Sequence, residues 1–171
     1  MKRNTHPHVD IREVSLRDGL QIESPIPLSA KLELLAAVAA TGVREVEATA
    51  FVSPSKVPSM ADAAELAAQL HDYPDIEFSA LVASSNGAKR AVAAGLRSIE
   101  YVVSASDAFS EANVGRSSAE ATDQIGEIVA IAHDSDVTVE VIVATAWDSP
   151  FEGPTPPQRV LDIAEIGRAH V

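Results

Sequence analysis

The sequence contains no cysteine and no long hydrophobic run, and each absence excludes certain classes of protein. Without cysteine there is neither a disulfide framework nor a cysteine-based zinc site. No run of about 18 apolar residues occurs, so no transmembrane helix is expected. The N-terminal residues lead into no apolar segment of the kind that a secretory signal requires. We therefore expect a cytoplasmic chain with no membrane partner.

Basic residues are also scarce, with 13 Lys and Arg against 25 Asp and Glu, which gives a net charge of -12. A nucleic-acid partner is not expected, because a polyphosphate surface binds to a basic face. What the chain has is apolar content, at 46% of its 171 residues. That is enough for one domain with a substantial core.

Stretches rich in Val and Ile alternate with stretches rich in Ala and Leu, which predicts alternating strands and helices. The expected strands are residues 9–16, 43–49, 76–83, 98–103 and 137–145. The expected helices run from about Lys31 to Gly42 with Ser29 as cap, over 61–70 and 87–94, from a capping box at Ser117 and Glu120, and from Thr155. Five such units, each roughly 30 to 35 residues long, predict a parallel α/β sheet.

Two parallel architectures are compatible with this alternation: an open doubly wound sheet and part of an eight-stranded barrel. No G-x-G-x-x-G sequence follows the first strand, which disfavours the dinucleotide-binding form of the open sheet. Every strand candidate carries a carboxylate, whereas strands covered on both faces are usually apolar throughout. On the expected strands Glu13, Ser15 and Arg17 share one parity, and so do Glu45, Glu47 and Thr49. A shared polar interior favours the barrel.

The position of each acidic residue along its strand indicates whether its role is structural or functional. Glu77, Glu100 and Glu140 lie near strand starts, where polar residues of a barrel usually serve stability. Glu47 lies near the carboxyl end of its strand, where barrel enzymes place their active sites. We therefore expect a functional role for Glu47.

The pair Arg17-Asp18, followed by Gly19, stands at the carboxyl end of the first strand. A carboxylate there is a natural ligand for a hard cation such as Mg²⁺ or Mn²⁺. A guanidinium beside it can stabilise a carbonyl oxygen as it becomes an enolate. On these residues alone, a surface turn with no chemical role remains the alternative.

Several motifs together resemble one enzyme family. They are Arg17-Asp18-Gly19-Leu20-Gln21, Glu47 to Pro54 with Val57-Pro58 and Met60, Asn86, residues 91–95, Ser104 to Asp107 with Asn113, and Ser149 to Gly153. This set resembles 3-hydroxy-3-methylglutaryl-CoA lyase of the DRE-TIM metallolyase superfamily and covers nearly the whole chain. Ala50 and Asp148-Ser149 depart from the family pattern, which leaves the identity of the substrate open.

The resemblance implies a (β/α)8 TIM barrel that cleaves a 3-hydroxyacyl-CoA to acetyl-CoA and a keto acid, acetoacetate in the parent case. It implies that Arg17 and Glu47 are catalytic and that Asp18 binds Mg²⁺ or Mn²⁺. The acyl-CoA substrate would contact the side chains Gln21, Thr49, Asn86, Ser106 and Asn113, although the last three could equally be cap or turn residues. The family often forms dimers, so a homodimer is expected.

The chain is shorter than the barrel it resembles, since eight units need about 250 residues and only five are present. The family's later His-x-His metal pair has no counterpart among the five histidines. We therefore expect residues 1–171 to form a single incomplete barrel domain that is inactive alone and insoluble or molten. Residues 166–171 match one translation of a common sequencing adapter, so a non-native tail is expected there. The alternatives are a non-catalytic half-barrel that binds an acyl-CoA or a partner subunit, and another lyase or aldolase of the superfamily.

Overall fold

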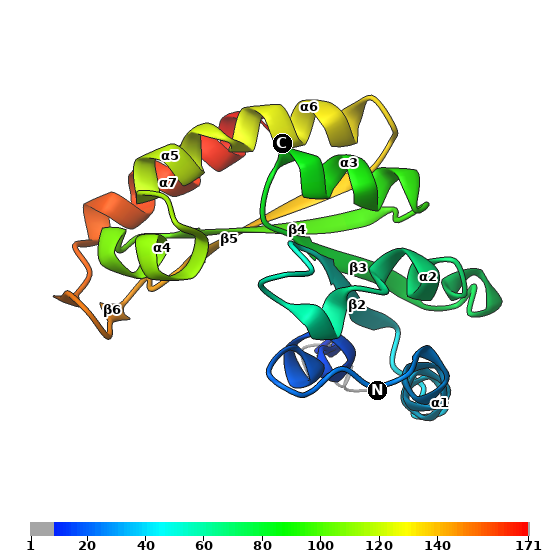
Figure 1. The fold of residues 1–171 in the computed structure, drawn as a ribbon. Coiled ribbons are helices and arrows are strands. Elements are labelled where there is room, and N and C mark those ends of the chain that lie inside the picture. The colour runs from blue at the N-terminus through cyan, green and yellow to red at the C-terminus, as the bar shows by residue number, and fades with distance from the viewer. Residues whose placement is uncertain (1–8, 171) are drawn as a thin grey trace, which may run out of the picture.

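The computed structural model describes residues 9–170, and its central feature is a five-stranded parallel sheet (Figure 1). The strands are β1 (Arg12–Glu13), β2 (Glu45–Phe51), β3 (Glu77–Val82), β4 (Ser98–Ser104) and β5 (Thr138–Ala144). They lie side by side in chain order, each parallel to the next. A doubly wound sheet reverses its order at a switch point, whereas a barrel keeps sequence order. The observed order confirms the barrel alternative.

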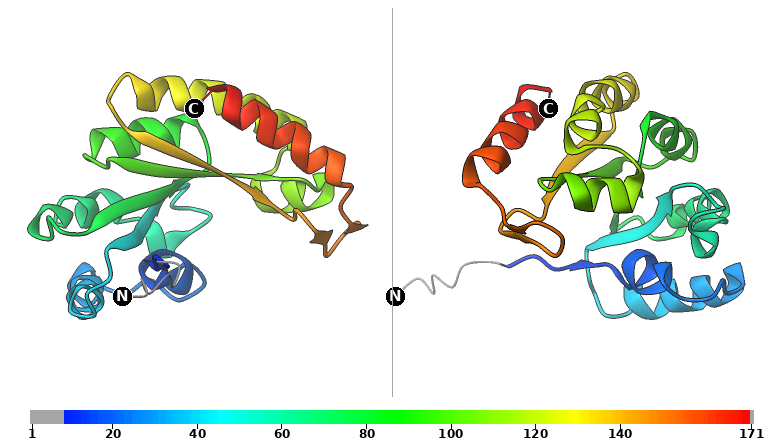
Figure 2. Two further views of the ribbon diagram at one scale, coloured as in Figure 1. Left: turned by 180° about the vertical axis from the view of Figure 1, so that it is seen from behind. Right: turned by 60° about the vertical axis from the view of Figure 1, so that its left-hand side comes forward.

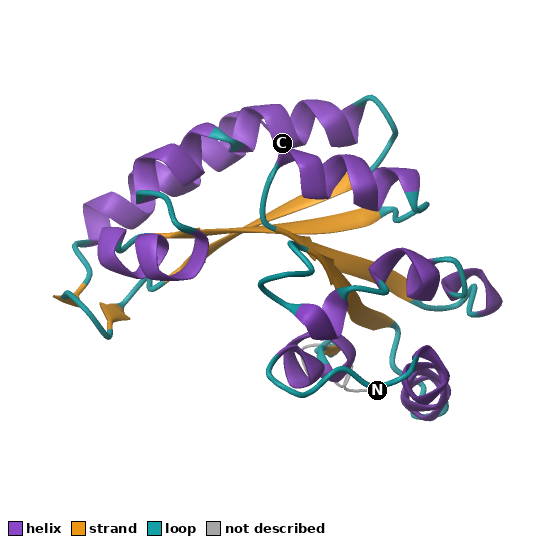
Figure 3. Ribbon diagram, viewed as in Figure 1, coloured by secondary structure: helices purple, strands orange, loops and turns teal. Residues whose placement is uncertain are grey.

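Helices cover the outer face of the sheet, and the sheet curls into a half-barrel. The α-helices are α1 (Leu28–Ala39), α2 (Ala63–Ala67), α3 (Ser85–Ala93), α4 (Asp107–Val114), α5 (Ser118–Asp123), α6 (Ile125–His133) and α7 (Pro157–His170). In the right-hand view of Figure 2 most of these helices form an arc outside the strands, while α4 (light green) lies across the ends of the strands, and the inner face of the sheet is open. Figure 3 shows the same separation of an orange strand layer from purple helices. Three short helical turns, η1 (Ser15–Gly19), η2 (Pro58–Met60) and η3 (Leu70–Asp72), and a hairpin, β6 (Asp148–Ser149) with β7 (Gly153–Pro154), complete the structure.

The core lies between the sheet and the helices. Neighbouring strands place Val46, Ala80 and Ile99 on the outer face, where all three are fully buried. From the helices, Leu35 and Ile128 pack into the same cluster. Burial of this apolar layer, at roughly 25 cal/mol per Å² of area removed from water, drives the helices onto the sheet. Within residues 9–170, no helix has the length and apolar character needed to cross a membrane.

The first strand is much shorter than residues 9–16, and the prediction of a strand through Leu16 is wrong. Only Arg12 and Glu13 pair with β2. The Glu13 carboxylate accepts hydrogen bonds from the Ser15 amide at 3.0 Å and the Ser15 hydroxyl at 2.9 Å. This local competition for the backbone turns the chain into η1, a π-helical turn. Ser15 and Arg17 therefore do not share a strand face with Glu13.

The shared parity expected along the second strand is also wrong at its end. The pairing of β2 with β3 shifts between Glu47 and Thr49, which marks an extra residue in β2. Beyond that point the side chains exchange faces, because the side-chain period of a strand is two. Thr49 is fully buried, and its hydroxyl lies 3.7 Å from the sulfur of Met60 rather than in the open half-barrel.

The helix caps are correct where the signal is local and wrong where another residue intervenes. The Ser117–Glu120 capping box is confirmed, and Gly42 and Gly95 adopt the left-handed conformation expected after a helix. Three cap and boundary predictions are wrong. The cap of α1 is Pro27 rather than Ser29, and α7 begins at Pro157 rather than directly after Thr155. The helix expected over 61–70 is reduced to α2, which lies between η2 and η3. The Pro27 carbonyl already accepts the amides of residues 30 and 31, and the Thr155 hydroxyl donates to the Thr145 carbonyl at 2.6 Å.

Candidate functional site

The turn η1 places the Arg17-Asp18 pair at the carboxyl end of the short first strand. The Val14 carbonyl accepts the amides of Arg17, Asp18 and Gly19 at 3.2, 2.7 and 3.4 Å. The buried Leu16 anchors the turn in the core, with 1% of its surface exposed. One face of the turn is thus fixed in the core while the following charged residues lie above β2.

Arg17 and Glu47 form a bidentate ion pair across 30 residues of sequence. The Arg17 Nε donates to Glu47 Oε1 at 2.6 Å, and Nη2 donates to Oε2 at 2.6 Å. The third contact is from Nη1 to Asp18 Oδ1 at 2.8 Å. The fork geometry of the guanidinium fits a carboxylate with two parallel bonds, which fixes its orientation as well as its position. The structure therefore brings together the three residues that sequence reasoning placed at the centre of the site.

Burial distinguishes the two carboxylates that contact Arg17. The Glu47 side chain is 1% exposed, whereas that of Asp18 is 62% exposed. Burial raises the pKa of Glu47, and the nearby Glu100 carboxylate raises it further, while the hydrogen bonds and charge of Arg17 oppose the shift. Glu47 is thus buried against Arg17, whereas Asp18 faces solvent.

A second ionic cluster lies at the amino ends of the strands, and sequence reasoning missed its central residue. Arg12 donates to Glu45 at 3.3 Å, to Glu100 at 3.1 Å and to Glu140 at 2.7 Å. Ser79 also donates to Glu100, at 2.5 Å. The structural role expected for Glu100 and Glu140 agrees with these contacts. Only the order of strands across the sheet could have indicated Arg12, because Glu140 is 128 residues away in sequence.

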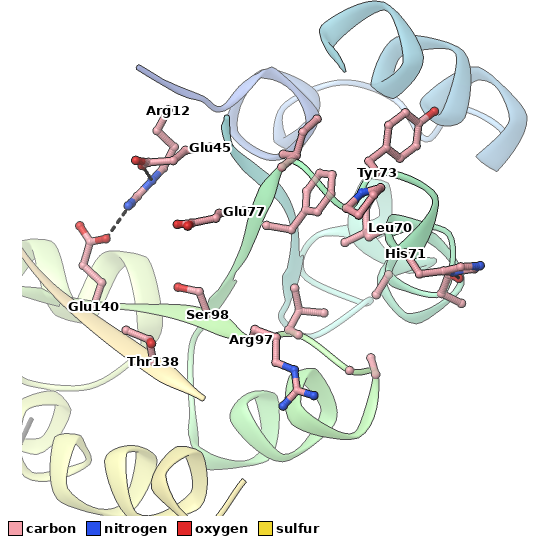
Figure 4. Close-up of a pocket in the computed structure, with 18 residues that line it drawn as sticks. Arg12, Glu45, Leu70, His71, Tyr73, Glu77, Arg97, Ser98, Thr138 and Glu140 are labelled. Atoms are coloured by element: carbon pink, nitrogen blue, oxygen red, sulfur yellow. Dashed lines mark hydrogen bonds and ion pairs between the residues drawn. The ribbon is translucent and has the colours of Figure 1, made fainter. Parts of the chain in front are cut away.

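An open cavity of about 810 Å³ adjoins this cluster, as Figure 4 shows. Its lining includes Arg12, Glu45 and Glu140, together with residues of the loops that precede the strands. It lies at the amino end of the sheet, opposite the Arg17–Glu47 pair. Barrel enzymes carry out chemistry at the carboxyl end, so the cavity is not the candidate site.

The remaining residues expected to contact substrate are held in separate ways. Asn86 is exposed in the first turn of α3, and Asn113 is exposed in α4. The Gln21 carbonyl accepts the Ser59 hydroxyl at 3.0 Å. Ser106 caps α4 by accepting the Phe109 amide at 3.1 Å.

The hydroxyl of Ser106 takes part in a wider network above β4 and β5. It donates to Glu152 and accepts from Ser149 at 2.8 Å, so both residues fix the loop after β5 against the start of α4. The cap and turn roles left open for this serine are therefore present in the structure. Contacts of substrate with Gln21, Asn86, Ser106 and Asn113 stay predictions, and the burial of Thr49 does not favour one there.

The described residues do not by themselves fit a divalent cation. Among residues 9–170 no group of three His, Cys, Asp or Glu side chains is arranged to hold a metal ion. Asp18 contributes one carboxylate, one oxygen of which accepts from Arg17. A single protein ligand does not define a cation geometry, although Mg²⁺ retains water ligands and uses few carboxylates. The expected role of Asp18 in binding Mg²⁺ or Mn²⁺ therefore stays a prediction.

Comparison with known proteins agrees with the geometry. The HMGL-like family matches residues 8–166. The chain is 36% identical over 159 residues to the cytoplasmic 3-hydroxy-3-methylglutaryl-CoA lyase of Rattus norvegicus. The matched residues make up 92% of this chain and 46% of that protein. It is 35% identical over 157 residues to the hydroxymethylglutaryl-CoA lyase of Pseudomonas mevalonii, covering 91% and 52%. The chain spans about half the length of these curated relatives.

A solved structure gives the same result in three dimensions. The HMG-CoA lyase of A. baumannii, in complex with coenzyme A and 3-methylmalate, superposes with a TM-score of 0.88 at 31% identity. The match covers 94% of this chain and 52% of that one. The resemblance inferred from the motifs and the expected partial barrel are both confirmed.

Proposed function

The chain belongs to the HMGL-like family, and we propose that it supplies the N-terminal part of a carbon–carbon lyase. The proposed reaction cleaves 3-hydroxy-3-methylglutaryl-CoA, or a related 3-hydroxyacyl-CoA, to acetyl-CoA and a keto acid. The names of the curated relatives support this class of reaction. The observation that carries the proposal is the bidentate pair of Arg17 and Glu47 at the carboxyl end of the sheet.

Arg17 is suited to hold the carbonyl oxygen on which charge develops. As the C3 hydroxyl loses its proton, its oxygen forms the carbonyl of the keto acid and the bond between C2 and C3 breaks. The electron pair of that bond goes to C2 and is shared with the thioester oxygen as an enolate, which takes up a proton at C2 to give acetyl-CoA. Three of the five guanidinium donors of Arg17 are bonded to Glu47 and Asp18, and the other two have no partner in the part of the chain that the structure describes and can meet that oxygen. A cation already oriented before the reaction stabilises the enolate without reorganisation, which is the most effective form of electrostatic catalysis.

Glu47 acts in this proposal by holding Arg17 rather than by touching the substrate. Its two oxygens are both bonded to Arg17, and its side chain is 1% exposed. The buried carboxylate therefore fixes the plane of the guanidinium. Asp18 lies beside it with an exposed carboxylate, in the position proposed for a metal ligand.

An acyl-CoA substrate is the partner that this proposal requires. The A. baumannii enzyme was solved with coenzyme A, which supports this class of ligand. The identity of the acyl group and the homodimer stay predictions. The cytoplasmic location also stays a prediction, because the curated relatives include both cytoplasmic and mitochondrial enzymes. The lyase reading is preferred to a non-catalytic half-barrel because a binding module has no need for an oriented Arg17.

The test is to express the full-length product of the gene that encodes this chain and to assay it for acetyl-CoA release from 3-hydroxy-3-methylglutaryl-CoA. We expect Arg17→Lys to lower kcat by about 10²- to 10³-fold, the usual effect of losing an oriented oxyanion donor. The matched control is Arg44→Lys, an exposed arginine at the other end of the sheet. Full activity of Arg17→Lys, or an active product that releases no acetyl-CoA, would refute the proposal.

A further inference from the structure

A lysine on α1 is buried as completely as the hydrophobic core. Lys31 is 1% exposed, yet its ammonium group has two oxygen partners. Its Nζ lies 2.5 Å from the Ser59 carbonyl and 2.5 Å from Asp62 Oδ1. Burying a charge is costly unless it is paired and hydrogen-bonded. The surroundings of Lys31 are therefore arranged around its charge, and the proposed reaction makes no use of it.

Both partners of Lys31 belong to the connection between β2 and α2. Asp62 precedes α2, and Ser59 is the central residue of η2. Met60, the next residue, is 2% exposed and accepts a contact from the Thr49 hydroxyl at 3.7 Å. The turn η2 is thus held by α1 on one side and by the end of β2 on the other.

The same turn also holds the segment that carries the candidate site. The Ser59 hydroxyl donates to the Gln21 carbonyl at 3.0 Å. Gln21 follows two residues after Gly19, the last residue of η1. A continuous series of contacts therefore joins the ammonium of Lys31, through Ser59 and Gln21, to the turn that presents Arg17 and Asp18. It joins η2 to η1 and α1, both of which precede it by many residues in the sequence.

We propose that Lys31 is a positioning residue for the Arg17-Asp18 turn and acts through Ser59 and Gln21. The proposal rests on the proposed function, because positioning matters only if Arg17 is the group that meets the substrate. The ammonium fixes the Ser59 backbone, and the fixed Ser59 hydroxyl holds the Gln21 carbonyl. Arg17 then meets Glu47 from one orientation, with its fork aligned on the two carboxylate oxygens.

Ser59→Ala is the most selective test, because it cuts the series at one bond. The variant loses the bond to Gln21 but keeps the backbone carbonyl and the Asp62 carboxylate that hold Lys31. Lys31→Met removes the charge and keeps an aliphatic side chain of similar length. The matched control is Ser55→Ala, an exposed serine of the same connection whose hydroxyl bonds only with that of Ser53 among described residues.

The readout is solvent exchange of the Arg17 Nε hydrogen in the full-length product of the gene that encodes this chain, measured by NMR after selective labelling of arginine. This hydrogen is donated to Glu47, so its exchange reports the alignment of the ion pair. We expect Ser59→Ala to raise the exchange rate about fivefold, the effect of losing one net hydrogen bond. Lys31→Met is expected to raise it at least as much, and Ser55→Ala to leave it unchanged.

Backbone amides of β3 and β4 in the same samples separate positioning from general stability. If Lys31 and Ser59 only stabilise the fold, exchange rises at these amides by the same factor as at Arg17, because global opening exposes all of them. An equal rise of exchange at Arg17 and at these amides would overturn the proposal. So would an unchanged exchange rate of the Arg17 Nε hydrogen in Ser59→Ala, or rapid exchange of that hydrogen in the unsubstituted protein. The measurement uses no substrate, so a failed lyase assay and a failed positioning test are distinguishable.

Discussion

Replacing Glu47 with glutamine tests how burial and the ion pair balance at the candidate site. Two guanidinium–carboxylate bonds contribute about 1.5 to 3 kcal/mol each. Removing a carboxylate from water costs several kcal/mol, by order of magnitude. The two effects are therefore similar in size. At neutral pH we expect the free energy of unfolding of Glu47→Gln to lie within about 1 kcal/mol of that of the original chain. The glutamine carbonyl can still accept one Arg17 hydrogen bond, and the loss of the other ionic bond is offset by the removal of the cost of burying a carboxylate.

The pH dependence gives the sign of the balance. The pKa of Glu47 is raised above its ordinary value of 4.5, chiefly by burial. A carboxyl group with a raised folded pKa binds protons more readily when folded, so its contribution is present below the unfolded pKa and is lost as pH rises through the folded pKa. The stability of the original chain relative to Glu47→Gln should therefore decrease as pH rises above 4.5.

Urea unfolding of both proteins, each prepared as the full-length gene product, at several pH values from about 4 to 8 measures this difference, because other titrating groups are common to both and cancel. Glu47→Ala serves as the contrast and is expected to lose about 3 to 5 kcal/mol, since it leaves Arg17 without its buried partner. If the advantage of the original chain over Glu47→Gln grows with pH instead, the attraction of Arg17 outweighs burial and the reasoning is wrong.

Two further predictions concern other parts of the molecule. Gly87→Ala should lower the free energy of unfolding, measured with urea, by about 2 to 3 kcal/mol, because a Cβ there would lie 2.5 Å from the Phe51 carbonyl oxygen. Gly167→Ala should instead stabilise α7 by about 0.5 to 1 kcal/mol, because its Cβ would meet only ordinary contacts. Equal effects of the two substitutions would contradict this packing argument. The hydrogen bond from the Ser118 amide lowers the pKa of Asp107 below 3.8. The stability that Asp107 contributes is therefore present above that value and is lost as pH falls through its folded pKa. In Asp107→Asn the melting temperature should fall less steeply with decreasing pH than in the original chain, and an equally steep fall would contradict this prediction.

The local features of the fold could be predicted from the sequence because their causes lie within a few residues. The capping box of Ser117 and Glu120 and the left-handed Gly95 follow from short-range hydrogen bonding and backbone sterics. The alternation of apolar strands and helices, with carboxylates in the strands, indicated a barrel with a polar interior. The Arg17-Asp18 pair and Glu47 stood out because charged residues at the ends of apolar strands are seldom there for packing.

The tertiary structure decided what depends on register and on contacts between distant segments. The extra residue after Glu47 turns Thr49 into the core, and no periodicity in the sequence announces it. Arg12 meets Glu140, and Lys31 meets Ser59, only because the sheet curls and the connections fold back onto it. The sequence by itself therefore determined which elements form and which residues carry the charge. The curl and register of the sheet determined which of those charges meet, because long-range pairing has no local signature in the chain.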